Sequence, residues 1–225
     1  MSVPSFLKFG FMGLMLLMGI CVQVFAQEQK QYIIFDSTQS KTFTVYKRQL
    51  TPDRFWVCTT DYSACGILDA NDRIVVPIRY HGLGLLHEGV LTACDSNNKY
   101  GYIDVNGRVI IPFYYKNTGD FGDRLAWVTD STGAQYFIDH KGHRKFDAIY
   151  DACGAFNNGR SVVYKGNLRG YINRRGKVVI PLQYKEAASF KHNRARVLLG
   201  NEYLIINRNG KVKAHAGYWE PIPPL

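Results

Sequence analysis

A motif of 34 to 35 residues recurs five times along this chain of 225 residues, and no other feature limits its possible folds as strongly. Each copy has an Asp or Asn just before a turn, here termed the anchor residue: Asp69, Asp104, Asp139, Asn173 and Asn207. Glycine follows three residues after the anchor in four copies, and tyrosine follows eleven residues after it in all five. Agreement at several independent offsets identifies a tandem repeat.

The second copy shows the elements of one unit most clearly. Residues 100–103 and 108–112 are β-branched and aromatic runs on either side of Asn106-Gly107. This pattern predicts an antiparallel hairpin with a two-residue turn of the primed type. A third apolar run, residues 125–128, follows a glycine-containing loop and is interpreted as the third strand of the unit. Units this small cannot bury their own apolar face, so they are expected to stack.

We therefore predict an all-β fold, a tandem array of about five three-stranded antiparallel units. An open superhelix is favoured, because the first hairpin has no third strand before it and the last has none after it. A closed β-propeller, completed by a strand from one end, is the alternative. A packed ladder from unit to unit is the structural role expected for Tyr80, Tyr115, Tyr150, Tyr184 and Tyr218. A sugar-stacking groove is the other use considered for these rings.

The two ends of the chain differ from the repeats. Residues 1–26 carry one basic residue, Lys8, then an apolar run that ends in V-F-A before Gln27, which predicts a secretory signal peptide. The run is too short for a retained membrane span. Cys21 suggests a lipoprotein, but Ile20 is not the small residue expected before a lipidated cysteine. We expect a periplasmic or extracellular protein with an N-terminal β cap at residues 27–63, a degenerate repeat. The repeat array follows at 64–219 and a proline-rich tail at 220–225.

The consensus K-x-G-Y-I-D-x-x-G-x-V-V-I-P-x-x-Y, followed by F-x-x-G-x-A-x-V, resembles the bacterial WG-repeat family, also called KWG repeats, over about residues 64–218. The naming Trp-Gly dipeptide is replaced by Cys65-Gly66, Tyr100-Gly101 and Arg169-Gly170, and is lost at Gln135-Tyr136 and Tyr203-Leu204. The resemblance implies an all-β repeat module, often exported, that serves binding or scaffolding. It supplies no family-wide catalytic residues.

Cys58 and Cys65 are predicted to form a disulfide. If Asp61-Tyr62 is the tip of a hairpin, residues whose numbers add up to 123 face each other, and these two cysteines do. An exported protein also meets an oxidising environment. The alternative is that both are small buried apolar side chains. Cys94 and Cys153 lie at different offsets in their copies and are left unpaired.

Positive charge is concentrated in the last copies. Residues 140–225 hold 16 Lys and Arg against 5 Asp and Glu, whereas residues 27–139 hold 11 against 13. A basic residue stands four positions after every anchor, and stacking would align these residues along one edge. The candidates for contacts with an anionic partner are Arg174, Arg175, Lys177, Arg208, Lys211 and Lys213. Alternatively, these side chains only keep sheet edges from pairing with other chains.

No catalytic or nucleotide-binding motif is present in the sequence. His140 and His143 lack acid or cysteine partners at ligand spacing, and the anchor acids fit turn chemistry. We expect a non-enzymatic binding or scaffold module at the cell envelope, without a cofactor. Its partner would be a protein or an anionic polymer such as glycan, lipopolysaccharide or peptidoglycan, and not nucleic acid. A purely structural envelope protein is the alternative, and an envelope hydrolase the third. We expect a monomer, with no membrane span after signal cleavage.

Overall fold

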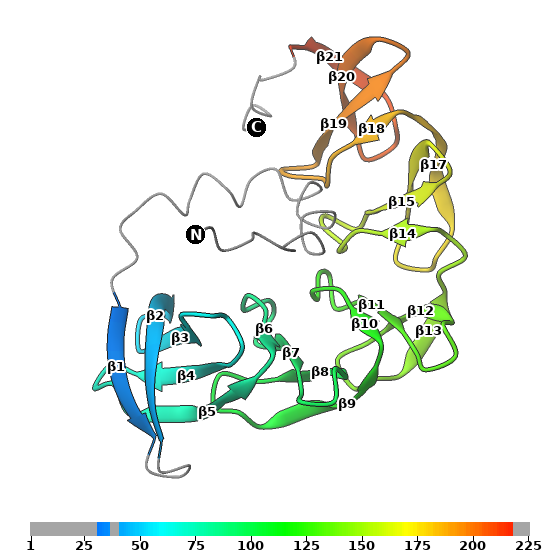
Figure 1. Ribbon diagram of the computed structural model, residues 1–225. Helices are drawn as coiled ribbons and strands as arrows, with labels where there is room; N and C mark the ends of the chain where they lie inside the picture. Colours follow the sequence, from blue (N-terminus) through cyan, green and yellow to red (C-terminus); the bar gives the residue numbers. More distant parts are fainter. Residues whose placement is uncertain (1–30, 37–40, 218–225) are drawn as a thin grey trace, which may run out of the picture.

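The computed structural model describes residues 31–36 and 41–217. The predicted signal peptide, Tyr218 and the C-terminal tail lie outside these residues. The described residues form 21 strands and no helix, arranged in five antiparallel sheets. Figure 1 shows the sheets following one another along an open arc whose two ends do not meet. The predicted open all-β array is therefore confirmed.

The first sheet has the order β1-β2-β3-β4-β5 and the other four have four strands each, also in chain order. The first contains β1 (Gln31–Asp36), β2 (Lys41–Thr51), β3 (Arg54–Thr59), β4 (Cys65–Asp69) and β5 (Ile74–Tyr80). The second contains β6 (Gly82–Leu83), β7 (Leu91–Cys94), β8 (Tyr100–Ile103) and β9 (Val109–Tyr115). The third contains β10 (Asn117–Thr118), β11 (Ala126–Thr129), β12 (Gln135–Ile138) and β13 (Arg144–Asp147). The fourth contains β14 (Ala152–Cys153), β15 (Ser161–Lys165), β16 (Leu168–Ile172) and β17 (Val178–Tyr184), and the fifth β18 (Glu186–Ala187), β19 (Arg194–Leu199), β20 (Glu202–Asn207) and β21 (Val212–Ala216).

In the second to fifth sheets, the repeating unit holds four strands rather than the predicted three. A two-residue strand, such as β10, precedes the other three. The apolar run of β11, interpreted as the third strand of its own copy, pairs with the hairpin of the next copy, where Trp127 faces Phe137. The chain passes from one sheet to the next through a single residue in three places, for example Lys116 between β9 and β10. In the first sheet, the β1–β2 hairpin takes the place of the short strand.

The turn at residues 104–108 is a tight hairpin, but not of the predicted primed type. A primed turn of type I′ needs positive φ at both central residues, whereas here Gly107 alone has it, with φ +82°. The Gly107 N–H donates to the carbonyl of Asp104 at 3.0 Å, which gives a three-residue loop that ends in a bulged glycine. The longer loop lets the Asp104 carboxylate accept the N–H groups of Asn106 and Arg108, both at 2.9 Å.

Three sheets contain a second bulge, opposite the glycine of the dipeptide that replaces Trp-Gly. In the second sheet, Tyr100 faces Tyr115 but Tyr102 faces Ile111, so β9 uses two extra residues around Pro112. The same shift occurs at Gly66 and at Gly170. The glycine is needed because the bulged backbone approaches it closely: a Cβ on Gly101 would lie 2.6 Å from the carbonyl oxygen of Ile111.

The other two sheets lack both the proline and this bulge. In the third sheet, Tyr136 faces Asp147 and Phe137 faces Phe146 in regular register. In the fifth sheet, Leu204 faces His215 in the same way. A side chain therefore fits at Tyr136 and Leu204, where the other sheets require glycine.

Aromatic pairs between consecutive sheets fill the core. One partner of each pair lies two residues before an anchor. The other lies seventeen residues after the same anchor, in a loop of the next sheet. The ring centroids of Tyr102 and Phe121, and of Tyr171 and Phe190, are 4.8 Å apart. The hydroxyl of Tyr102 donates to the carbonyl of Gly119 at 2.7 Å, and the hydroxyl of Tyr171 to that of Ala188 at 2.7 Å. These contacts join neighbouring sheets through both packing and hydrogen bonding.

Replacing Tyr171 by phenylalanine is expected to lower the free energy of unfolding by about 1 kcal/mol, because the partly buried carbonyl of Ala188 would lose its donor. Phe137 occupies the equivalent position in the third sheet, so the ring itself should still pack. Urea unfolding of Tyr171→Phe beside Tyr164→Phe measures this loss. Tyr164 is half-buried, and its replacement should change the free energy of unfolding by less than about 0.5 kcal/mol. Equal stability of the two variants would contradict the assignment.

The tyrosines predicted as a ladder occupy the last strand of a sheet or the segment just after it. Tyr80, Tyr115 and Tyr184 are buried, Tyr150 is half-buried and Tyr218 lies outside the described residues. Tyr80 stacks on Phe113 with centroids 5.8 Å apart, and Tyr115 meets Tyr136 edge-on at 6.4 Å. In both cases the partner belongs to the next sheet. These tyrosines thus pack between sheets, against aromatic rings from other positions of the repeat.

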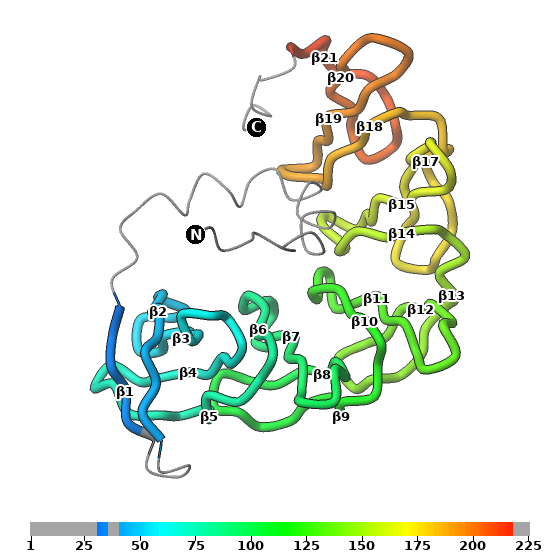
Figure 2. Tube along the Cα trace, in the orientation of Figure 1, coloured from blue at the N-terminus to red at the C-terminus, as the bar shows by residue number. Residues whose placement is uncertain are grey.

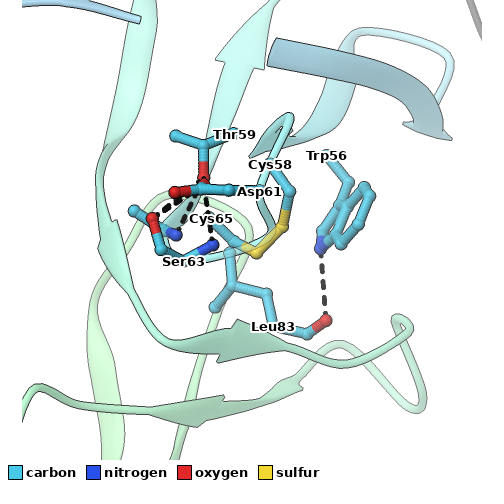
Figure 3. The surroundings of a disulfide bond; sticks show 8 residues. Trp56, Cys58, Thr59, Asp61, Ser63, Cys65 and Leu83 are labelled. Atoms are coloured by element: carbon cyan, nitrogen blue, oxygen red, sulfur yellow. Dashed lines mark hydrogen bonds between the residues drawn. A yellow bond between two sulfur atoms is a disulfide. The ribbon is translucent and has the colours of Figure 1, made fainter. Parts of the chain in front are cut away.

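Cys58 and Cys65 form a disulfide between β3 and β4 (Figure 3). In all five facing pairs of these two strands, from Arg54 with Asp69 to Cys58 with Cys65, the two residue numbers add up to 123, as predicted from the sequence. The turn between them is ordered by Asp61, which accepts hydrogen bonds from the hydroxyl of Thr59 and from the N–H and hydroxyl of Ser63. These bonds lower the pKa of Asp61 to about 2. Cys94 and Cys153 are free thiols.

Candidate anion-binding edge

Two sets of turns lie at the same end of the strands. The first set, here called the tip loops, comprises residues 51–54, 87–90, 122–125, 157–160 and 191–194. The second set comprises the anchor turns, residues 69–73, 104–108, 139–143, 173–177 and 207–211. A strand runs away from each tip loop, and the next strand returns to the anchor turn of the same sheet. In Figures 1 and 2, the loops that join β6 to β7, β10 to β11, β14 to β15 and β18 to β19 line the inside of the arc.

The last four tip loops are primed turns, the type that the sequence had predicted for the anchor turns. Both central residues of each have positive φ: Glu88 and Gly89, Asp123 and Arg124, Asn158 and Gly159, His192 and Asn193. Such turns match the right-handed twist of the flanking strands. Four of these eight residues are neither glycine nor asparagine, so the left-handed backbone is held there against the preference of the side chain.

Hydrogen bonds connect each of these tip loops to the next. The side chain of the first central residue accepts a backbone N–H from the second central residue of the following loop. Glu88 accepts from Arg124 at 3.0 Å, and Asn158 accepts from Asn193 at 3.1 Å. Asp123 accepts from Gly159 in the same way. This series was not predicted from the sequence, although an acid or amide recurs there at 35-residue spacing.

Three of the tip loops also meet the anchor turn of the next sheet. Arg54 donates to the side-chain oxygen of Asn106 at 3.0 Å. Nε2 of His140 lies 2.9 Å from the carboxylate of Glu88. Nε of Arg160 donates to the backbone carbonyl of Arg208 at 2.9 Å. Tip loops and anchor turns therefore form one continuous surface, here called the turn edge.

Aspartate and asparagine anchors make the same hydrogen bonds. The side-chain oxygen of Asp69 accepts the N–H groups of Asn71 at 2.8 Å and Arg73 at 2.9 Å. That of Asn207 accepts two N–H groups, both at 3.0 Å. The prediction that the anchors serve turn chemistry is confirmed. Because an amide is sufficient, asparagine at the last two anchors removes two negative charges from the turn edge without altering the turn.

The charge of the turn edge changes sign along the arc. In the first two sheets, it carries five carboxylates and three arginines: Asp53, Asp69, Asp72, Glu88 and Asp104, with Arg54, Arg73 and Arg108. In the last two sheets, it carries eight cations and no Asp or Glu: Arg160, Arg174, Arg175, Lys177, Lys191, Arg194, Arg208 and Lys211. The third sheet is intermediate, with His143 and Lys145 lying 3.5 and 3.7 Å from Asp139.

The predicted anionic-partner residues come together on this edge. Arg174, Arg175 and Lys177 are exposed in the fourth anchor turn, Arg208 and Lys211 in the fifth, and Lys213 is exposed on β21 beside it. Within residues 31–36 and 41–217, none of these six has a carboxylate within salt-bridge distance. That they bind an anion stays a prediction. Sequence reasoning missed Arg160, Lys191 and Arg194, because their place on the edge depends on how the sheets stack.

A family model described as the WG containing repeat matches residues 100–129, 137–168 and 170–203. Residues 100–203 therefore contain WG repeats. Each matched segment begins in or just before the last hairpin of one sheet and extends into the next sheet, so each contains one anchor turn and one tip loop. Among curated proteins, none matches this WG-repeat chain.

Some solved structures are similar to this chain at low sequence identity. BamB from Moraxella catarrhalis is 12% identical, with 84% of this chain and 70% of that chain covered and a TM-score of 0.47. Kluyveromyces lactis Hsv2 is 10% identical, with 72% and 60% covered and a TM-score of 0.45. A catalytically inactive virginiamycin B lyase from Staphylococcus aureus with Quinupristin is 14% identical, with 85% and 75% covered and a TM-score of 0.44.

Proposed function

We propose that this WG-repeat protein is a non-enzymatic binding or scaffold module of the cell envelope, which holds an anionic partner on the turn edge of its last two sheets. The charge of equivalent turns carries this proposal. The anchor turns have the same backbone hydrogen bonds in all five sheets, yet acids are common in the first two and absent from the edge of the last two. A requirement of the fold would act on all five sheets alike.

Export from the cytoplasm is supported by two features. The disulfide between Cys58 and Cys65 is of a kind that persists in oxidising compartments. The N-terminal sequence also has the pattern of a secretory signal peptide, although it lies outside the described residues. In the part of the chain that the structure describes, no helix is long and apolar enough to cross a membrane.

The partner that suits this edge is an anionic polymer. Eight cations on rigid turns provide many weak contacts that act together and fade with salt. An acidic glycan, the phosphates of lipopolysaccharide and peptidoglycan are the envelope polymers of this kind. The family model that matches describes a repeat and not an enzyme, which supports a role without catalysis or cofactor.

Retention of the mature protein on a polyanionic resin tests the proposal. Replacing Arg174, Arg175 and Lys177 together by glutamine should weaken binding about tenfold at low salt, because each exposed ion pair contributes roughly 0.5 kcal/mol. The matched control replaces Lys116, Lys165 and Lys185, three exposed lysines at the opposite ends of the strands. It removes the same charge and should elute within about twofold of wild type. Equal shifts for both triple variants would leave solubility as the role of the charge, and the purely structural alternative would stand.

A further inference from the structure

Two arginines meet at the junction of the fourth and fifth sheets. Nε of Arg160 donates to the carbonyl of Arg208 and Nη1 donates to the carbonyl of Gly159, both at 2.9 Å. Two carbonyls thus fix the Arg160 guanidinium, which is half-buried. Burial lowers the pKa of Arg160, and the positive charge of Arg208 lowers it further.

The Arg208 side chain lies against the same tip loop. Its Nη2 is 3.0 Å from the position that a Cβ on Gly159 would take, and Gly159 itself has a φ of +77°, which favours glycine. The two guanidinium groups therefore converge on Gly159 from different sheets. Within the described residues, neither has a carboxylate within salt-bridge distance. Like charges brought together in this way are unfavourable unless an anion compensates them.

The equivalent junction of the second and third sheets provides its own compensation. His140 follows its anchor as Arg208 follows Asn207, and it lies 2.9 Å from Glu88. Asn158 takes the place of Glu88 in the fourth sheet, and Arg160 takes the place of Val90. Compared with the junction of the second and third sheets, the junction of the fourth and fifth sheets has one carboxylate fewer and one cation more.

The carboxylate of Asp123 also contacts this tip loop. It accepts the N–H of Gly159, as Asn158 accepts that of Asn193. It forms no salt bridge with Arg160 or Arg208 among the described residues. Asp123 thus completes the series of bonds between tip loops and leaves the two arginines without a counter-charge of their own.

The geometry points to a binding site for a phosphate or sulfate group between Arg160 and Arg208. Guanidinium groups offer planar pairs of N–H donors that match the oxygens of such anions. The side-chain oxygen of Asn158 accepts the N–H of Asn193, so the NH₂ group of Asn158 can act as a donor to an anion. The inference rests on the proposed function and deepens it, since this site would recognise the charged group that the envelope polymer carries.

Titration of the mature protein with inorganic phosphate and with sodium sulfate, at low ionic strength, tests the site by calorimetry and NMR. We expect saturable binding of one anion per chain. Arg208→Gln keeps the backbone carbonyl that holds Arg160 and should weaken binding at least tenfold, or about 1.4 kcal/mol. Lys165→Gln removes the same charge at the opposite ends of the strands, where its side chain is exposed, and should weaken binding less than about twofold.

A third variant tests the missing carboxylate. Asn158→Asp keeps the oxygen that accepts the Asn193 N–H, as Asp123 shows, and places a negative charge beside the arginines. It should weaken phosphate binding at least about tenfold. Binding of only one of the two anions would support the site and identify the group it recognises. Absence of saturable binding, or equal losses in Arg208→Gln and Lys165→Gln, would overturn the inference. Retention on the polyanionic resin would then still decide the proposed function separately.

Discussion

Replacing Gly101 by alanine is expected to lower the free energy of unfolding by about 3 kcal/mol or more, because no rotamer change can relieve the clash. The added Cβ would lie 2.6 Å from the carbonyl oxygen of Ile111 and 3.0 Å from the carbonyl carbon and oxygen of Pro112. All three are backbone atoms of the bulge in β9. Relief requires the bulge to move, and with it the strand that leads into the third sheet.

Urea unfolding of Gly101→Ala beside Gly82→Ala measures this effect. A Cβ on Gly82 would meet only the Cβ of Cys94, at 4.0 Å, so this control should change the free energy of unfolding by no more than about 1 kcal/mol. Gly170→Ala repeats the test in the fourth sheet, where the Cβ would lie 2.7 Å from the carbonyl oxygen of Ile180 and 2.8 Å from the amide nitrogen of Leu182. Unfolding of either variant at the urea concentration of Gly82→Ala would show that the bulge adapts.

The close contact between the glycine and the bulged backbone explains why this chain loses the glycine of the Trp-Gly pattern and the proline together. The sequence shows the loss of glycine at Tyr136 and of proline at Asp147 as two separate substitutions. The structure joins them, because the bulge around the proline is what brings backbone atoms against the glycine. Without the bulge, Tyr136 faces Asp147 in regular register and a side chain is accepted.

The sequence predicted what depends on local spacing. The period, the hairpins and the facing of Cys58 and Cys65 all follow from counting residues along one or two strands. The grouping of strands into sheets could not be predicted from the sequence, because a periodic pattern does not show where one structural unit ends and the next begins. The structure shows, for example by the pairing of Trp127 with Phe137, that β11 belongs with the hairpin that follows it.

The candidate site could likewise be predicted only where it depends on local spacing. The cations of the anchor turns stand at a fixed offset and could be aligned from the sequence. Arg160 could not be assigned to that set, because its contact with Arg208 spans 48 residues and depends on the stacking of two sheets. The absence of a partner acid also required the comparison with Glu88 and His140, whose pairing only the structure shows.

Removing the disulfide between Cys58 and Cys65 is expected to lower the free energy of unfolding by about 2 to 3 kcal/mol. The cross-link closes a short loop and so limits the unfolded chain. The folded turn has its own supports: the Thr59 N–H donates to the carbonyl of Ala64 at 2.8 Å, and Asp61 orders the residues between them. The native arrangement in Figure 3 should therefore persist without the bond.

Denaturation of the oxidised protein, the reduced protein and Cys58→Ala/Cys65→Ala measures the loss. Reduction leaves both buried side chains in place, so it isolates the cross-link, whereas the alanine pair adds the cost of lost packing. Cys153→Ala is the matched control, because it removes a thiol that forms no disulfide. Burial raises the pKa of the Cys153 thiol to about 12, so this thiol should stay protonated and inert at pH 8 during the experiment.

The dependence on denaturant separates the two possible origins of the effect. If the cross-link acts on the unfolded chain, the reduced protein exposes more surface on unfolding and its m-value rises while its native spectrum is unchanged. If the bond instead holds β3 against β4, reduction alters the native state around Trp56, whose indole N–H donates to the carbonyl of Leu83 in the second sheet at 3.1 Å. A shift of Trp56 fluorescence before unfolding would therefore contradict the entropic account, because it would place the loss in the folded protein.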